Sequence, residues 1–536
     1  LSEKEIAYEQ PLPVHVDSTL TIHFDRNYLL TAELTFTATE QTEVCFGNTT
    51  YIAGPGAHSF RTFDAFGMTD ASCTLTTSAP ITIKSMRFLN RVYPFERLGA
   101  FSCSDSDLNR LWEMSLHTLE QVTEDGYQDC PWERAEWMGD AAVIEYPLTR
   151  VTLAGEGDVL SDPRLIRKMI RDIAQSADSA GRIKAHHPSD RFDIHAYIED
   201  YSCLWVQSLR EYYEFTGDAD FVRQMWPVLT GLMDWFLKQQ TESGLIQGRE
   251  FVIFDNPLKY QTCEGATLNA FVFRAFHDAA FLAEIIGDEN KAVLYQKSAN
   301  ALQTTFNTVL WNDTLNLFNA STTHEPTYHS ALIPLNRGIV DPDKQPLLTT
   351  WLLDSIDKVS ESLMTYTHFW LFEFLYAQDE PEWDNKVLDL ISSRYKNFYA
   401  ADNIGFTVAE SFSGDRPFHN FGSAAAYFMS ANILGVHVEL PLSSDVLFIK
   451  PQLGDLSHAS GTVVTEHGLV HVDWKNKSDS FEFSITIPDN KKAIVYLPAP
   501  LGDMNCEINE KPAQFTREHR YAVVELSGGC HKGIMR

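Results

Sequence analysis

The chain has 536 residues, of which 44% are hydrophobic and 12% aromatic, so we expect about two to four domains with buried cores. It carries 42 basic and 73 acidic side chains, a net charge of -31, which disfavours nucleic acid or an anionic membrane as a partner. A small neutral molecule is the expected ligand.

The eight cysteines are scattered and form no Cys-x-x-Cys pair, so the sequence predicts neither a zinc site nor a disulfide framework. Reduced thiols and a cytoplasmic location are expected. His186-His187 resembles a metal tract only superficially, because adjacent side chains point apart, and we expect no metal and no cofactor. No run reaches the roughly 18 apolar residues of a membrane helix. The chain does not begin with Met, which leaves a removed export signal open.

Residues 1–98 are predicted to form an N-terminal β domain. Short segments such as Leu20–Phe24 and Ile81–Met86 alternate apolar and polar residues and are separated by Gly, Pro, Asn and Asp.

Residues 99–437 are predicted to form a helical domain. Apolar residues recur at three- and four-residue steps from Leu108 onward, and one unit is repeated, in which a helix ends in Gly-Asp and another begins at once. Gly217-Asp218 and Gly287-Asp288 are its two clearest cases. About a dozen predicted helices suit a closed ring of six hairpins, although a bundle or an open solenoid uses the same pieces.

Residues 438–536 return to alternation and are predicted to form a C-terminal β domain, with a turn at Glu466-His467-Gly468. No low-complexity linker separates the three domains, so we expect them to pack rigidly against one another.

Two segments carry carboxylates that suit glycosidic hydrolysis, which needs one protonated carboxyl and one ionised carboxylate. In Asp129–Asp140, the acids Asp129, Glu133 and Glu136 lie beside Cys130-Pro131 and two tryptophans, which could keep one carboxyl desolvated and protonated. The alternative is a helix N-terminus with acids placed for its dipole.

The second segment contains Glu410, after an apolar stretch and before a Gly/Pro loop with His419. Such a residue could line the pocket of a ring. The alternative, a loop acid paired with Arg416, is equally compatible with the composition.

Residues 100–475 resemble the catalytic portion of the bacterial α-L-rhamnosidases of glycoside hydrolase family 78. The family pattern Asp-Cys-Pro-x-Arg-x-Glu leading to Trp-x-Gly-Asp is similar to Asp129–Asp140 here. The resemblance implies an (α/α)6 barrel catalytic domain between N- and C-terminal β-sandwich-like domains. It also implies inversion at the anomeric carbon, with Glu133 as general acid, Glu410 as general base and His419 as a sugar ligand.

Further matches are Asp200-Tyr201-Ser202-Cys203-Leu204-Trp205 and Phe254-Asp255-Asn256-Pro257. A carboxylate can accept hydrogen bonds from two neighbouring sugar hydroxyls, and an aromatic ring can pack against the apolar face of a deoxy sugar. The resulting substrate-binding candidates are Asp129, Arg134, Trp137, Asp200, Trp205, Asp255 and His419, with Glu264 as a further pocket acid.

The sequence departs from the family pattern at two places. It is shorter between Cys130-Pro131 and Glu133, with Trp132 where an Arg is common, which leaves Glu136 as a rival acid. Near Glu410 the usual Trp-Glu-Arg-Trp is replaced by Ala409-Glu410-Ser411-Phe412, which could alter the accepted aglycone.

The sequence therefore predicts an inverting hydrolase that releases terminal α-L-rhamnose from glycosides or short oligosaccharides. A toroidal polysaccharide lyase and a non-catalytic carbohydrate-binding protein are the alternatives. A homodimer is expected by analogy.

Overall fold

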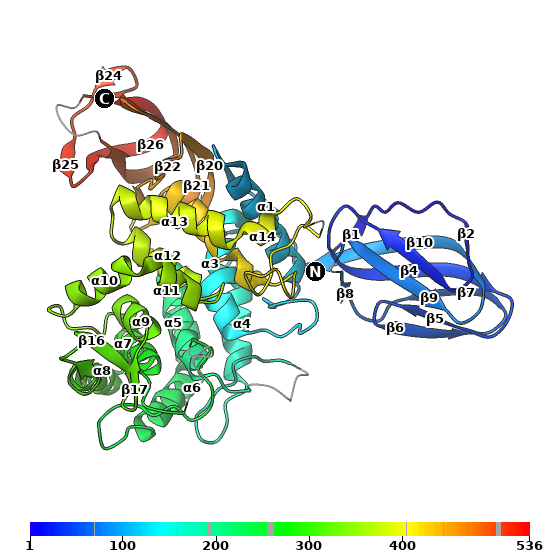
Figure 1. Cartoon of the computed structure of the whole chain (residues 1–536), viewed down its shortest axis with the longest axis horizontal. Coiled ribbons are helices and arrows are strands. Elements are labelled where there is room, and N and C mark those ends of the chain that lie inside the picture. The colour runs from blue at the N-terminus through cyan, green and yellow to red at the C-terminus, as the bar shows by residue number, and fades with distance from the viewer. Residues whose placement is uncertain are drawn as a thin grey trace.

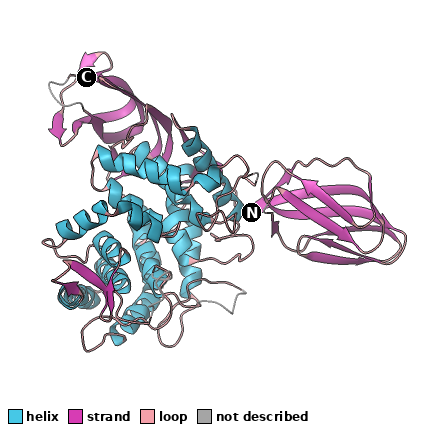
Figure 2. Ribbon diagram, viewed as in Figure 1, coloured by secondary structure: helices cyan, strands magenta, loops and turns pink. Residues whose placement is uncertain are grey.

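The computed structural model of the chain describes residues 1–68, 70–157, 159–189, 196–254, 262–403, 405–442, 444–499 and 505–536. A β domain, a domain of helices and a second β domain follow one another along the chain (Figures 1 and 2). Within the described ranges, no helix is both long and apolar enough to cross a membrane.

The N-terminal domain is a sandwich of two antiparallel sheets, as predicted. Over several residues of its strands, side chains alternate between the core and solvent, which gives each sheet one apolar face. One sheet contains β1 (Ser2–Ile6), β2 (Val14–Val16), β4 (Leu29–Ala38), β7 (Gly56–Arg61), β8 (Phe66–Gly67) and β10 (Ile81–Val92). The other contains β3 (Thr19–His23), β5 (Thr42–Phe46), β6 (Thr49–Ala53) and β9 (Ser72–Thr77).

The helical domain is a closed ring of hairpins. Its outer helices are α1 (Ser106–Val122), α4 (Arg164–Ala174), α6 (Ala219–Lys238), α8 (Glu289–Val309), α10 (Gln345–Asp354), α11 (Ile356–Ser362), α13 (Pro381–Arg394) and α14 (Lys396–Tyr399). Its inner helices are α2 (Met138–Asp140) continuing through the π-helical turn η1 (Ala141–Glu145) into α3 (Tyr146–Thr152), α5 (Glu199–Thr216), α7 (Ala266–Ile286), α9 (His329–Arg337), α12 (His368–Tyr376), and η3 (Asn420–Ser423) continuing through α15 (Ala424–Phe428) into η4 (Met429–Ile433). The inner helices contact one another in the order α5, α7, α9, α12, α15 and α3, and α2 closes the ring against α5.

The predicted Gly-Asp junctions join outer and inner helices. Gly217 ends α5 with a φ of 68°, and the Asp218 side chain accepts a hydrogen bond from the Phe221 N–H at the start of α6. Gly287 has a φ of 82°, and Asp288 caps α8 through the Lys291 N–H. Glycine adopts this left-handed conformation without a Cβ clash, and aspartate satisfies an otherwise unpaired helix N–H, so the dipeptide makes a sharp reversal.

One inner helix and one hairpin were not predicted. α9 is short and contains Pro334, a poor helix former, but it is buried between α7 and α12. The segment before it forms β15 (Trp311–Asn312), β16 (Leu317–Ser321) and β17 (His324–Pro326). Packing inside the ring outweighs the weak local preference of α9.

The C-terminal domain is built on one ten-stranded sheet. It contains β12 (Ala100–Cys103), β18 (Val436–Val438), β19 (Val446–Ile449), β20 (His458–Thr465), β21 (Gly468–Lys477), β22 (Ser480–Pro498), β23 (Cys506–Ile508), β24 (Lys511–Pro512), β25 (Thr516–Glu518) and β26 (Tyr521–Met535). β20 and β21 form the predicted hairpin around Glu466. β12 and β18, which the sequence assigns to the helical domain, pair into this sheet because their backbone groups find partners there. A separate small sheet joins β11 (Glu96–Arg97), β13 (Leu153–Gly155) and β14 (Val159–Leu160).

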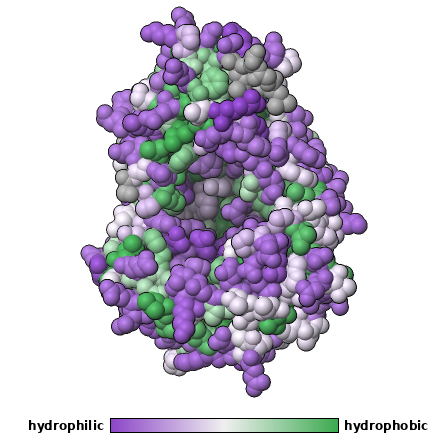
Figure 3. Space-filling view, turned by 90° about the vertical axis from the view of Figure 1, so that its left-hand side faces the viewer, coloured by the Kyte–Doolittle hydropathy of each residue, from purple (hydrophilic) through white to green (hydrophobic). Residues whose placement is uncertain are grey.

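The helical and C-terminal domains share one continuous core, whereas the N-terminal sandwich has its own. Figure 3 shows a hollow near the middle of the face that carries the C-terminal domain above and helices below. Between these two domains lies a cavity of about 350 Å³, lined by inner helices and by β18 and β20. The sheet thus covers one end of the ring and leaves the other end for the loops that precede the inner helices.

Candidate active site

A cavity of about 150 Å³ lies at the end of the ring where the inner helices begin. Its walls are the loops before α2, α7, α12 and α15 and the start of α5. The residues that line it are Asp129, Glu133, Trp137, Asp140, Ile198, Tyr201, Phe251, Ile253, Met364, Glu410, His419 and Phe421. Five of the predicted site residues, from segments almost 300 positions apart, are therefore brought together: Asp129, Glu133, Trp137, Glu410 and His419.

Asp140 lines this cavity, and the protein bonds only one of its two side-chain oxygens among the described residues. The Tyr201 hydroxyl donates to its Oδ2 over 2.9 Å, and Oδ1 is buried without a hydrogen-bond partner among the described residues. Burial raises the pKa of Asp140 to about 8, and the charges of Glu133 and Glu410 add to this effect. At neutral pH a protonated Asp140 can both donate to and accept from a sugar hydroxyl.

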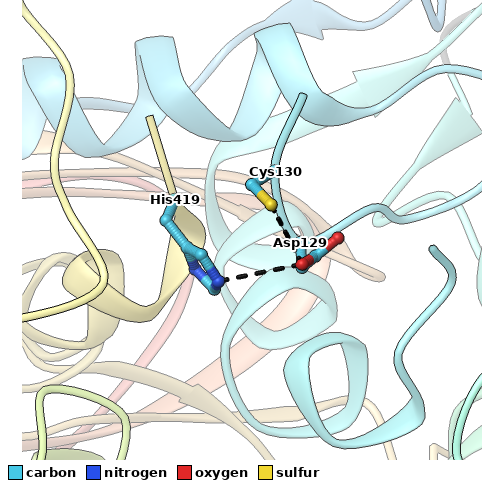
Figure 4. Close-up of side chains that lie close together, drawn as sticks. All are labelled: Asp129, Cys130 and His419. Carbon is cyan, nitrogen blue, oxygen red and sulfur yellow. Dashed lines mark hydrogen bonds and ion pairs between the residues drawn. The ribbon is translucent and has the colours of Figure 1, made fainter. Parts of the chain in front are cut away.

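Asp129, Cys130 and His419 form a buried cluster at the wall of the cavity (Figure 4). The Cys130 thiol donates to Asp129 Oδ2 over 3.0 Å, and His419 Nε2 lies 3.8 Å from the same oxygen. Burial raises the pKa of Asp129 well above its usual range, and Asp140 and Glu133 raise it further. One donor atom from each of the three residues lies within 4.8 Å of the other two, so the cluster could hold a metal ion. The expectation that no metal takes part remains a prediction.

One hydrogen bond to the His419 ring fixes its tautomer. Nδ1 accepts from the Phe421 N–H over 3.2 Å, and burial lowers the pKa of His419 to about 3, so the ring is neutral with its proton on Nε2. The 3.8 Å to Asp129 is longer than a hydrogen bond, so the Nε2–H can donate to a sugar hydroxyl.

Glu133 and its rival Glu136 lie on different sides of their segment. Glu133 is half-buried in the cavity wall. Glu136 is buried outside it, where Oε1 accepts a hydrogen bond from Lys168 over 2.6 Å. Burial raises the pKa of Glu136 to about 7, against the opposing effect of Lys168. Trp137 faces the cavity, and its ring rests on His186 with centroids 4.2 Å apart.

Glu410 is held by a loop with an unusual backbone. Its N–H donates to the Arg416 carbonyl over 3.1 Å, and the Arg416 Nη1 donates to Glu410 Oε2 over 2.9 Å. Phe406, Arg416 and Phe418 all have positive φ values, between 53° and 71°. Such conformations cost energy in non-glycine residues and persist where the surroundings fix them, often at functional sites. Both interpretations of Glu410 therefore hold together: it pairs with Arg416 and also lines the cavity.

Asn420 bonds to residues on both sides of Asp140, in the segment that carries Glu133. Its N–H donates to the Asp129 carbonyl over 3.2 Å, and its side-chain amide donates to Glu145 over 2.8 Å. Glu145 is the last residue of η1, the π-helical turn that begins directly after Asp140 in the chain. Such turns recur at functional sites.

Four further candidates do not line this cavity and make their contacts elsewhere, so their roles as substrate ligands stay predictions. Arg134 pairs with Asp64 and Glu124. Asp200 accepts from the Ile253 and Phe254 N–H groups, each over 3.1 Å, and so positions the cavity wall. Trp205 is fully buried, and its Nε1 donates to the Ile170 carbonyl, so it belongs to the core. Glu264 accepts hydrogen bonds from Thr241 and Ser243 in a neighbouring turn. Asp255 lies outside the described residues.

Sequence reasoning missed Asp140 and Tyr201 as cavity residues. Both belong to segments that resemble the family pattern, Trp137-Met138-Gly139-Asp140 and Asp200-Tyr201. Spacing gave a signal for Asp140, since it lies three residues after Trp137 and so one helical turn away.

Two family models match the chain. Residues 96–392 match the bacterial alpha-L-rhamnosidase 6 hairpin glycosidase domain, and residues 446–508 match the bacterial alpha-L-rhamnosidase C-terminal domain. An α-L-rhamnosidase of Alteromonas sp. (strain LOR) is 22% identical over 473 residues, which make up 82% of this chain and 49% of that protein. The chain thus spans about half the length of this relative.

Solved structures share the fold at low sequence identity. The GH78 rhamnosidase of Bacillus sp. GL1 superposes with a TM-score of 0.76 at 20% identity, covering 91% of this chain and 54% of that one. The Streptomyces avermitilis α-L-rhamnosidase complexed with L-rhamnose gives a TM-score of 0.76 at 16% identity, covering 100% and 53%. These similarities agree with the ring and its flanking β domains. The glycosidase-domain model matches more than half of the residues of this chain. The chain therefore belongs to the bacterial α-L-rhamnosidase family.

Proposed function

We propose that this chain hydrolyses terminal α-L-rhamnosides with inversion, using Glu133 as general acid and Glu410 as general base. The observation that carries the proposal is that both carboxylates line one small cavity together with polar groups suited to sugar hydroxyls. Inverting glycosidases need two carboxyl groups on opposite sides of the sugar, one to protonate the leaving oxygen and one to activate water.

The surroundings of the two carboxylates suit different roles. Glu410 accepts a charge-assisted hydrogen bond from Arg416, whose own pKa this contact raises. An ionised carboxylate held in this way can accept a proton from water. Glu133 lies beside the buried acids Asp129 and Asp140, at the point where the cavity meets a wider cleft. A leaving group can extend from Glu133 into that cleft.

The remaining polar groups suit the ring hydroxyls of a bound sugar. The Nε2–H of His419 can donate, Asp140 Oδ1 lacks a partner among the described residues, and Asp129 lies between them in the wall. Trp137 offers an apolar surface for a deoxy sugar, whose methyl group favours an aromatic neighbour. The Streptomyces avermitilis relative was solved with L-rhamnose, which supports the choice of sugar.

The test is a screen of aryl glycosides that includes the α-L-rhamnoside, followed by Glu133→Gln and Glu410→Gln. We expect release from the α-L-rhamnoside and loss of turnover in both variants with the fold intact by circular dichroism. Glu264→Gln is the matched control, because this acid lies outside the cavity. Full activity in either cavity variant would remove that residue from the mechanism. Rhamnose binding without release would favour a binding protein, and an unsaturated product absorbing in the ultraviolet would favour a lyase.

A further inference from the structure

A second and much larger space adjoins the candidate active site. This cleft has a volume of about 1230 Å³ and lies between the N-terminal sandwich and the loop of residues 131–134. Glu133 lines both this cleft and the smaller cavity. If Glu133 protonates the glycosidic oxygen, the leaving group must begin at Glu133 and extend away from the cavity that holds the rhamnose. The cleft is the space on that side.

The two walls of the cleft are fixed to each other. Arg134 pairs with Asp64 of the N-terminal domain and with the buried Glu124, and Arg91 donates to Glu124 over 2.9 Å. A Cβ added to Gly67 would lie 2.4 Å from Cβ of Pro131, so the backbone of β8 packs directly on this loop. A preformed cleft can bind a ligand without the entropic cost of ordering its walls.

The chemistry of the cleft suits a neutral sugar. Trp132 is 44% exposed in its wall, which is unusual for so large an apolar side chain, and it lies next to Glu133 in the sequence. An aromatic face can pack against the C–H face of a pyranose ring, while hydroxyl and amide groups bind the ring hydroxyls. The described wall supplies such groups from Asn48, Ser72, Thr74 and Ser189. Its guanidinium, Arg134, is neutralised by two carboxylates, so the described wall lacks an unpaired cation for an acidic sugar.

We infer that the cleft binds the leaving group of the substrate, that this leaving group is a neutral carbohydrate of more than one sugar unit, and that Trp132 is the platform for its first ring. The inference rests on the proposed function and specifies its substrate class. It gives the N-terminal sandwich a role in substrate selection and assigns a purpose to the residue that replaces the usual Arg of the family.

The experiment compares two substrates in the full chain. α-L-Rhamnosyl fluoride fills only the small cavity, whereas a neutral rhamnosyl trisaccharide also reaches the cleft. For Trp132→Ala we expect kcat/KM on the best trisaccharide substrate to fall about tenfold, and kcat/KM on the fluoride to stay within about twofold. Trp132→Phe should recover most of the loss, because it restores an aromatic face. Phe63→Ala is the control, since Phe63 is a 95% exposed aromatic residue of the N-terminal domain that does not line the cleft.

Two outcomes would overturn the inference. These are an equal loss on both substrates and no loss on the trisaccharide. Failure of the proposed function looks different, because the wild-type chain would then leave rhamnosyl fluoride intact. In that case the leaving disaccharide alone is titrated against the wild type and Trp132→Phe by intrinsic fluorescence. Quenching that the variant diminishes would retain the cleft as a sugar site, and its absence would reject it.

Discussion

The Tyr201 hydroxyl donates to Oδ2 of Asp140 over 2.9 Å, inside a cavity where the other carboxylate oxygen has no partner among the described residues. One oxygen of this buried acid is thus held by the protein, and the other is buried without a partner among the described residues. The contact joins the end of α2 to the first turn of α5, two neighbours in the inner ring.

Asp140 should make stability depend on pH. Its pKa is about 8 in the folded chain and ordinarily 3.8, so between these values the folded state binds a proton that the unfolded state does not. The free energy of unfolding therefore falls as pH rises through this window. Asp140→Asn should remove up to about 1.4 kcal/mol per pH unit from that slope.

Urea unfolding of wild type and Asp140→Asn at several pH values from 5 to 8 measures the two slopes. Asp343→Asn is the control, because the side chain of Asp343 is 79% exposed. Parallel slopes in wild type and Asp140→Asn would show that Asp140 does not hold a proton in the folded chain.

Glu136→Gln should keep the catalytic activity. Glu136 bonds to Lys168 outside the cavity, so kcat/KM on an aryl rhamnoside should change by less than about threefold, whereas loss of a general acid costs about 10²–10⁴-fold. Melting temperature should fall, because Lys168 loses a buried charged partner. A loss of activity as large as that of Glu133→Gln would make Glu136 the acid.

Chelation should leave the rate unchanged. The Cys130 thiol is a poor metal ligand, because burial and the neighbouring Asp129 raise its pKa well above the usual range. We expect the same kcat/KM before and after dialysis against EDTA. Excess Zn²⁺ should inhibit by occupying Asp129 and His419, and Cys130→Ser should leave that inhibition unchanged, because the protonated thiol contributes little to metal binding. Activity lost with EDTA and restored by one metal would instead identify a metal-dependent enzyme.

Local sequence patterns predicted most of the fold. The Gly-Asp junctions at Gly217 and Gly287 depend on the conformations of single residues, and the 3.6-residue repeat marks each long helix, so both can be predicted without tertiary information. α9 could not be found in this way, because Pro334 weakens its local preference and only burial inside the ring stabilises it.

The candidate site was predictable in part. The motifs identified Glu133, Glu410 and His419, and the structure brings all three to one cavity. A motif does not say which way a side chain points, however. Trp205 follows Tyr201 by one helical turn, yet Trp205 faces the core and Tyr201 faces the cavity. Arg134 follows Glu133 directly, but it points to the N-terminal domain, whose position no local pattern records.

The central claim is hydrolysis of α-L-rhamnosides in which Glu410 activates water, and the configuration of the first product tests it most directly. Proton NMR of the wild-type reaction, recorded faster than mutarotation, distinguishes the two anomers of free rhamnose. Attack by water on the face opposite the leaving group predicts that β-L-rhamnose appears first and the α-anomer only later. If α-L-rhamnose is the first product, the reaction retains configuration, and the role of Glu410 as general base is wrong.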